Sequence, residues 1–245
     1  VLVAAVISLL AIFVIWRLLP ESRPEAVDAT LNVLSIRKLF HIEHKECYEM
    51  QDCPDTTLRS ILRMPGMPLI FSIYFLNFLG FSFFYAGFPV YASTRLEWSP
   101  GELGVFLTVS SLIMVIVQGP VLSYLSTRVA DAWLVLIGSL LIALSFVALT
   151  QSNYAMIYLA NVLLSVGNGL MWPSFLAILA QRSDPSKQGT IMGYANSTGS
   201  LASIFGLVLG GILFTRLGPS VFLIGATMLF AITILSTRLF IKKTA

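Results

Sequence analysis

Residues 73–89, IYFLNFLGFSFFYAGFP, and residues 157–173, IYLANVLLSVGNGLMWP, are two apolar stretches that share residues at a constant spacing of 84. The pairs are Ile73 and Ile157, Tyr74 and Tyr158, Asn77 and Asn161, Leu79 and Leu163, and Pro89 and Pro173. The segments that follow also begin alike, because Pro100 and Gly104 match Pro185 and Gly189. Shared leucines mean little between apolar helices, but shared Tyr, Asn and Pro at one spacing indicate an internal repeat.

The composition predicts a membrane protein. The chain is 57% hydrophobic and 11% charged, with a mean hydropathy of +0.86, whereas soluble domains carry about 25% charged residues. Seven apolar runs approach the ~20 residues that a helix needs to span a bilayer: 1–19, 68–92, 103–125, 133–150, 154–180, 189–214 and 219–240. None alternates apolar and polar residues as the strands of a membrane barrel do, so we expect an all-α membrane protein.

The runs divide the chain into four parts. We expect a transmembrane helix at 1–19, a loop at 20–67, a compact six-helix transmembrane bundle at 68–240 and a tail at 241–245. The first run starts without methionine and lacks the basic start of a signal peptide. We therefore expect a spanning helix cut by a fragment boundary, and a chain that is part of a longer protein.

The basic residues predict the orientation. With the 20–67 loop in the cytoplasm and alternating spans, thirteen lie on the cytoplasmic side: Arg17, Arg23, Arg37, Lys38, Lys45, Arg59, Arg63, Arg128, Arg182, Lys187, Arg238, Lys242 and Lys243. The opposite side holds only Arg95 and Arg216. This split follows the positive-inside rule, so we expect a multi-pass protein of the cell membrane with its central loop and carboxyl terminus in the cytoplasm. The basic excess is spread over loops, which argues against a nucleic-acid partner.

On this topology the repeat is inverted, because residues 68–92 run outward and residues 154–180 run inward. The six helices then form two sets of three. Inverted repeats are typical of secondary transporters, in which the substrate site lies near mid-membrane at the repeat interface.

Aromatic, amide and hydroxyl side chains at helical spacing are the candidates for substrate binding. They are Tyr74, Asn77, Phe81, Tyr85, Phe88, Gln118, Asn161, Ser165, Asn168, Trp172 and Asn196. Each has an alternative interpretation as an interhelical contact, with a hydrogen bond contributing about 0.6 kcal/mol. Their recurrence on several helices favours a shared cavity for an amphipathic ligand.

Small residues and prolines are the candidates for packing and gating. Gly189, Gly193, Gly206 and Gly210 share one broad helical face, where close packing explains most of them. Pro89, Pro120 and Pro173 fall towards the exit ends of their helices, where kinks can assist gating.

Several functional classes find no support in the sequence. No Asp, Glu, Lys, Arg or His lies deep in any of the seven runs, so the chain has no obvious proton-relay carboxylate and no lysine for retinal. No HExxH or GxSxG motif is present. We expect neither an enzyme nor a cofactor, and ion coupling must come from sequence outside this chain.

With these features in place, the chain resembles the carboxyl-terminal half of a major facilitator superfamily transporter, in particular of the drug:proton antiporters of the tetracycline-resistance-like branch. The resemblance rests on Leu19-Pro20-Glu21-Ser22 at the end of helix six, Leu62-Arg63-Met64-Pro65-Gly66 before helix seven, Gly167-Asn168-Gly169 with Pro173, Pro185, Gly189 and Gly193, and Gly206 with Gly210-Gly211. It implies a twelve-helix transporter whose last seven helices are present. It also implies proton-coupling acids in the amino-terminal half.

The loop between helices eight and nine departs from the family's G-x-L-x-D-R-x-G-R motif. Arg128 is retained, but Ser123, Thr127 and Ala130 replace glycine, aspartate and glycine. A carboxylate latch in this loop is therefore not expected, and Arg128 is left to cap a helix end or contact lipid headgroups.

The expected function is alternating-access transport, most simply the proton-coupled efflux of lipophilic or amphipathic small molecules. One alternative is transport of a metabolite, such as a sugar or an organic acid, by the same superfamily. The other is a seven-helix sensor or receptor that signals through the 20–67 loop, against which the inverted repeat argues.

The polar loop contains every histidine and cysteine of the chain: His41, His44, Cys47 and Cys53. Their spacing, H-x2-H-x2-C-x5-C, matches no familiar zinc pattern, and a reducing cytosol disfavours a Cys47–Cys53 disulfide. We expect no metal site, and we interpret the loop as a connector.

Overall fold

The structure is a computed structural model that describes residues 2–18, 58–151, 153–183 and 187–241. Contacts divide the chain into two compact units, Val1–Cys53 and Pro54–Ala245. The described part of the first unit is helix α1 (Leu2–Leu18), which is apolar along its length. A helix in the first run is thus confirmed, whereas its crossing of the membrane stays a prediction. The histidine and cysteine segment 41–53 lies outside the described residues.

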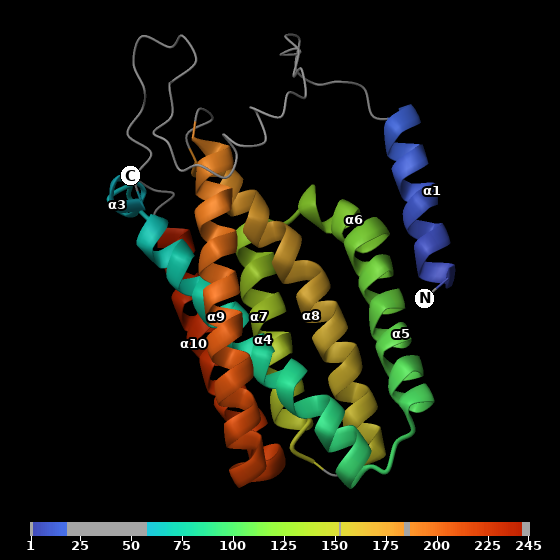
Figure 1. The fold of residues 1–245 in the computed structure, drawn as a ribbon. Helices are drawn as coiled ribbons and strands as arrows, with labels where there is room; N and C mark the ends of the chain where they lie inside the picture. The colour runs from blue at the N-terminus through green and yellow to red at the C-terminus, as the bar shows by residue number, and fades with distance from the viewer. Residues whose placement is uncertain (1, 19–57, 152, 184–186, 242–245) are drawn as a thin grey trace, which may run out of the picture. The chain divides into compact units, whose positions relative to one another are not determined.

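The second unit consists of apolar helices that follow one another up and down the bundle (Figure 1). They are α3 (Leu58–Leu62), α4 (Met67–Arg95), α5 (Pro100–Ile116), the π-helix η1 (Val117–Val121), α6 (Leu122–Ser126), α7 (Asp131–Ala148), α8 (Tyr154–Gln181), α9 (Gln188–Leu217), the 3-10 helix η2 (Gly218–Ser220) and α10 (Val221–Ile241). Five segments are long and apolar enough to cross a membrane, and the last, Gln188–Arg238, contains both α9 and α10. These elements match the six predicted runs of the bundle.

Local sequence explains where the helices begin. Ser99 and Glu102 form a capping box at α5, in which the Ser99 N–H donates to Glu102 Oε2 at 2.7 Å. Asn153 caps α8, because its Oδ1 accepts from the Ala155 N–H at 2.9 Å. Gly66 precedes α4 with φ of 89°, a conformation that favours glycine.

The helices pack as an inverted repeat. Helix α4 packs against α9 and α10, helix α8 packs against α5 and α7, and α7 packs against α10. The repeat converts α4 into α8, α5 into α9 and α7 into α10, so the packing of α4 against α9 and α10 corresponds to the packing of α8 against α5 and α7. Because α4 and α8 run in opposite directions (Figure 1), the predicted arrangement of three helices plus three inverted helices is confirmed.

Glycines set the spacing of the closest helix pairs. A Cβ added to Gly206 of α9 would lie 2.5 Å from Ser82 Cβ of α4. Between α7 and α8, a Cβ on Gly138 would lie 2.6 Å from the carbonyl oxygen of Gly167. Gly210 also faces α4, with Ala86 Cβ at 3.2 Å from the added atom. These contacts are the close approach that small residues permit between membrane helices.

The small-residue face of α9 is not uniform, however. A Cβ added to Gly189 or Gly193 would meet no described atom within 4 Å. The packing interpretation therefore applies to Gly206 and Gly210, whereas Gly189 and Gly193 lie open within the described part of the chain.

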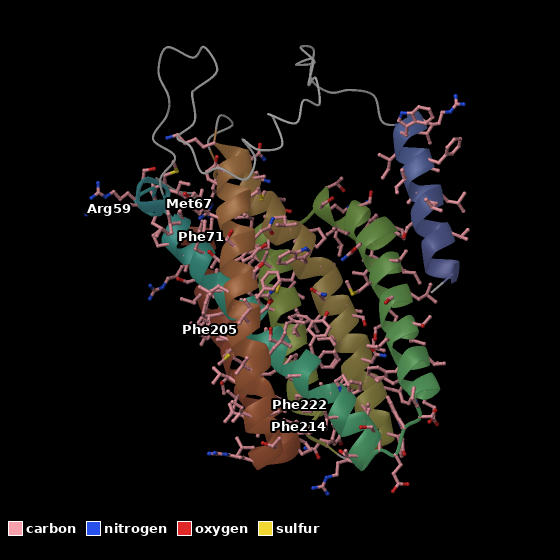
Figure 2. All side chains as sticks on the ribbon, viewed as in Figure 1. Arg59, Met67, Phe71, Phe205, Phe214 and Phe222 are labelled. Carbon is pink, nitrogen blue, oxygen red and sulfur yellow. The ribbon has the colours of Figure 1, made fainter. Side chains whose placement is uncertain are left out.

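An aromatic core occupies the bundle end where α4 and α9 finish and α10 begins. Phe222 of α10 packs edge-on to Tyr91 at a centroid distance of 6.0 Å and to Phe146 at 6.4 Å, and it lies 6.3 Å from Phe214 (Figure 2). Phe222 and Tyr91 are fully buried. This cluster ties α10 to α4, α7 and α9.

Substitution of Gly206 tests the α4–α9 packing. Gly206→Ala is expected to destabilise the protein by about 1–3 kcal/mol, because the added methyl group overlaps Ser82. Thermal unfolding of the detergent-solubilised protein measures the loss. Gly211→Ala is the matched control on the same helix, since its Cβ would meet no described atom within 4 Å. Equal stability of the two variants would contradict this packing.

Candidate functional site

A pocket of about 310 Å³ lies between α4, α5, α8 and α9. It is lined by Asn77, Phe78, Phe81, Ser82, Tyr85, Met114, Asn168, Trp172 and Ser203. Five of these, Asn77, Phe81, Tyr85, Asn168 and Trp172, are among the predicted binding residues. No charged side chain lines the pocket. Apolar walls with a few polar groups are typical of a small-molecule site.

Asn77 is the most unusual residue of this pocket. Its side chain is only 6% exposed, and its Oδ1 has no hydrogen-bond partner among the described residues. An unpaired buried carbonyl group costs about 1–3 kcal/mol. Asn77 therefore carries a buried acceptor without a described partner, in a residue that lines the pocket.

The opposite wall carries a second amide. Asn168 of α8 is half-buried, and its Nδ2 lies 3.7 Å from Met114 Sδ. Sulfur is a weak acceptor, so this contact is easily exchanged for a ligand oxygen. The pocket thus presents an acceptor from α4 and a donor from α8.

Aromatic rings form the rest of the wall. The Trp172 ring stands edge-on to Phe78 at a centroid distance of 5.4 Å, and Phe81 lies 6.2 Å from Tyr85. Tyr85 is 62% exposed, so its ring stands at the open side of the pocket. Such ring faces suit flat apolar groups and organic cations.

Asn161 joins two helices, and neither Asn161 nor Ser165 lines the pocket. Asn161 is 1% exposed. Its Nδ2 donates to the Phe106 carbonyl oxygen of α5 at 3.2 Å, and its Oδ1 accepts from the hydroxyls of Ser110 and Ser165. For these two residues the structure supports the alternative interpretation, an interhelical hydrogen-bond network between α8 and α5.

Four other predicted residues also lie outside the pocket lining. The Tyr74 hydroxyl donates to Asn196 Oδ1 at 2.8 Å, which joins α4 to α9. Phe88 is fully buried and stacks on Phe106 at a centroid distance of 4.7 Å. Gln118 of η1 is exposed.

The prolines lie inside three helices. Pro89 lies inside α4, Pro173 inside α8 and Pro120 inside η1. Proline supplies no N–H, and the wider turn of η1 is a π-bulge of the kind found at functional sites. Their part in gating stays a prediction.

Arg128 follows α6, in the loop whose sequence departs from the family motif. Its guanidinium carbon lies 3.8 Å from the centroid of the Tyr124 ring. This distance is well within the range of a cation–π interaction, which gives the residue a local structural partner.

Sequence reasoning missed Phe78, Ser82 and Met114 as lining residues. Phe78 and Ser82 lie four residues apart on α4, beside the predicted stripe of Asn77, Phe81 and Tyr85, so a wider stripe includes them. Met114 carried no signal in an apolar run. Ser203 of α9 was not predicted as a lining residue either.

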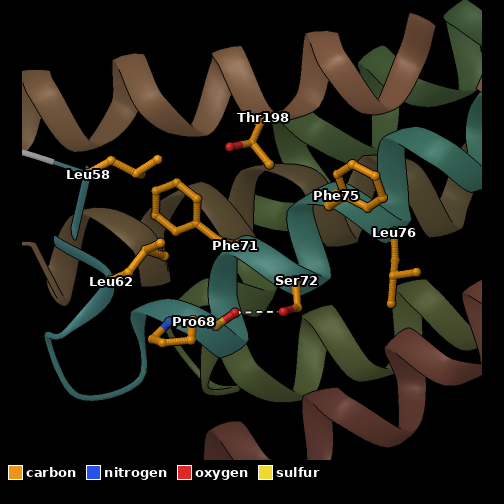
Figure 3. A pocket seen from close by; sticks show the side chains of 8 residues that line it. All are labelled: Leu58, Leu62, Pro68, Phe71, Ser72, Phe75, Leu76 and Thr198. Carbon is orange, nitrogen blue, oxygen red and sulfur yellow. Dashed lines mark hydrogen bonds between the residues drawn. The ribbon is translucent and has the colours of Figure 1, made fainter. Parts of the chain in front are cut away.

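A larger groove of about 550 Å³ lies where α3 meets α4 and α9 (Figure 3). Leu58, Leu62, Phe71 and Phe75 contribute to its apolar lining. Its hydroxyls are engaged within their own helices, as Ser72 Oγ donates to the Pro68 carbonyl oxygen at 2.8 Å. The groove offers no unpaired polar group, so the pocket around Asn77 is the stronger site.

The helices thus form an inverted-repeat bundle, long and apolar enough to cross a membrane, with a pocket between them. The sequence profile of the Major Facilitator Superfamily matches residues 70–245. The chain therefore belongs to this superfamily. Among the described residues, no three His, Cys, Asp or Glu side chains gather as a metal site requires.

Curated relatives agree with this assignment. The chain is 22% identical over 191 residues to Multidrug resistance protein 2 of Bacillus subtilis, covering 77% of this chain and 48% of the relative. It is 26% identical over 153 residues to the class G tetracycline resistance protein of Vibrio anguillarum, covering 62% and 39%. The chain thus spans less than half of each relative.

A solved transporter shares the fold. The human organic anion transporter MFSD10 (TETRAN) superposes with a TM-score of 0.59 at 20% identity, covering 76% of this chain and 43% of MFSD10. Together with the family match, this confirms the predicted helical bundle.

The repeat-related asparagines provide a test of the two structural roles. Asn161→Ala is expected to lower the free energy of unfolding by about 1–2 kcal/mol, because it removes the bonds between α8 and α5. Asn77→Ala is expected to leave it unchanged or to raise it, because the variant removes a buried oxygen that has no described partner. Thermal unfolding in detergent compares the two. A larger loss for Asn77→Ala would contradict the assignment.

Proposed function

We propose that the chain provides the last seven helices of a secondary active transporter that works by alternating access. The two halves of such a transporter rock around a central site near mid-membrane. The observation that carries the proposal is a pocket lined by aromatic rings and two amide residues, with no charged lining residue. Membership of the superfamily favours this function over a seven-helix sensor.

The chemistry of the pocket favours a neutral or cationic amphipathic substrate. A donor group on the substrate satisfies Asn77 Oδ1, while its apolar body packs against Phe81 and Trp172. An anion gains little here, because the pocket lining offers no cation. The alternative is a sugar or organic acid, and an organic anion would need a cation from another part of the protein.

Efflux is the proposed direction, and the similarity to multidrug and tetracycline resistance proteins supports it. Proton coupling is proposed to reside in the part of the transporter outside this chain, since no carboxylate lines the pocket. The pocket itself then supplies substrate affinity, and its partner half supplies the titrating group.

Pocket substitutions test the site. Asn77→Ala and Trp172→Ala are expected to lower transport of a lipophilic cationic dye by about tenfold, because each removes a substrate contact worth about 1–2 kcal/mol. Uptake of the dye into inverted vesicles containing the full-length protein measures this. Thr227→Ala is the control, since this exposed hydroxyl on α10 donates to the Ile224 carbonyl oxygen of its own helix. Unchanged transport by both pocket variants would remove the site assignment.

An imposed pH gradient tests the coupling separately. Vesicles with an acidic interior are expected to accumulate the dye, and collapse of the gradient by an ionophore is expected to abolish the accumulation. Everted orientation places the cytoplasmic side outward, so protons leave as the dye enters. Dye movement that is insensitive to the gradient would refute proton coupling and leave the pocket assignment standing.

A further inference from the structure

Two arginines line a second pocket, at the bundle end where α4 and α9 finish. This pocket has a volume of about 560 Å³. Arg95 and Thr94 come from the last turn of α4, and Arg216 and Thr215 come from the last turn of α9. Val90, Phe214 and Leu217 add an apolar side to the same pocket. The Arg59 end of the bundle lies opposite (Figure 2).

The charge of this pocket is uncompensated. Within the part of the chain that the structure describes, neither Arg95 nor Arg216 has an ion-pair or hydrogen-bond partner for its side chain. The threonine hydroxyls donate elsewhere, Thr94 to the Val90 carbonyl oxygen at 2.7 Å and Thr215 to the Ile212 carbonyl oxygen at 2.7 Å. The pocket therefore presents two guanidinium groups whose donors are all available.

The repeat supplies a comparison for this corner. The inverted counterpart is the corner where α8 ends and α7 begins, and there the chain provides its own carboxylate. Gln181 Nε2 of α8 donates to Asp131 Oδ2 of α7 at 3.0 Å. At the Arg95 corner the connection before α10 is Gly218-Pro219-Ser220, which contains no acidic residue, and the nearest carboxylates in sequence, those of Glu97 and Glu102, do not line the pocket.

The position of the two arginines is itself unusual. Of fifteen basic residues, they are the two that the charge distribution assigns to the non-cytoplasmic side. The positive-inside tendency disfavours basic residues there. Each arginine also compensates the negative carboxyl end of its own helix, but that role does not require both to share one pocket.

We propose that this pocket binds a phosphate-bearing anion between Arg95 and Arg216. Guanidinium groups match phosphate oxygens with paired donors. The apolar side formed by Val90, Phe214 and Leu217 favours a phospholipid over free phosphate, because an acyl chain can lie along it. The site is separate from the Asn77 pocket, so its test does not depend on the transported substrate.

Ligand-induced stabilisation of the full-length protein tests the proposal. The protein is purified in detergent, stripped of lipid and titrated with phosphatidylglycerol while thermal unfolding is followed. We expect the midpoint to rise, and we expect half-saturation in the Arg95→Gln/Arg216→Gln variant to need about tenfold more lipid. Arg59→Gln is the matched control, because Arg59 is also exposed but lies on α3. The unliganded midpoint of each variant checks that it folds.

In a second experiment, inorganic phosphate is added to the lipid-free protein at constant ionic strength, and the unfolding midpoint is measured again. If the unfolding midpoint rises with phosphate but not with lipid, and the double variant loses this rise, the same site binds a free anion. Arg95→Lys/Arg216→Lys is expected to restore part of the response, since it keeps the charge without the paired donors. Equal responses of the wild type and the double variant to both probes, or no response to either, would overturn the proposal.

Discussion

The contact between Gly206 of α9 and Ser82 of α4 is the constraint on which the bundle and its pocket depend. Lipid supplies no hydrophobic drive between helices, so close backbone approach must hold them together. A Cβ at Gly206 would lie 2.9 Å from the Leu79 carbonyl oxygen, which leaves no room for a larger residue. Ser82 and Ser203, on either side of this contact, both line the pocket. The helix spacing at Gly206 therefore determines where the pocket wall stands.

The inverted repeat explains the fold, and departures from it explain the site. Asn77 and Asn161 occupy equivalent positions on α4 and α8, but their surroundings differ. Ser110 of α5 donates to Asn161 Oδ1, whereas no described residue donates to Asn77 Oδ1. One copy of the asparagine thus joins two helices, whereas the other has a side-chain oxygen without a described partner.

Sequence periodicity predicted the helices, the repeat and five lining residues because lipid exposure and helix geometry act on local sequence. Periodicity could not predict that Asn77 and Asn161 differ in their hydrogen bonds, because this difference depends on which side chain of a neighbouring helix lies opposite each asparagine. It could not separate Gly206 from Gly189 either, because both carry the same signal while only one meets a facing helix. The meeting of Arg95 with Arg216, 121 positions apart in sequence, is likewise a property of tertiary packing.

The central claim is that the Asn77 pocket opens to each side of the membrane in turn. Labelling of Ser203→Cys, in a protein whose Cys47 and Cys53 are replaced by serine, tests it most directly. A membrane-impermeant thiol reagent is predicted to label this position from either side of sealed vesicles, and a transported substrate is predicted to slow the labelling from both. Alternating access would be contradicted if a protein that still transports were labelled from one side only and if the substrate did not change the rate of labelling.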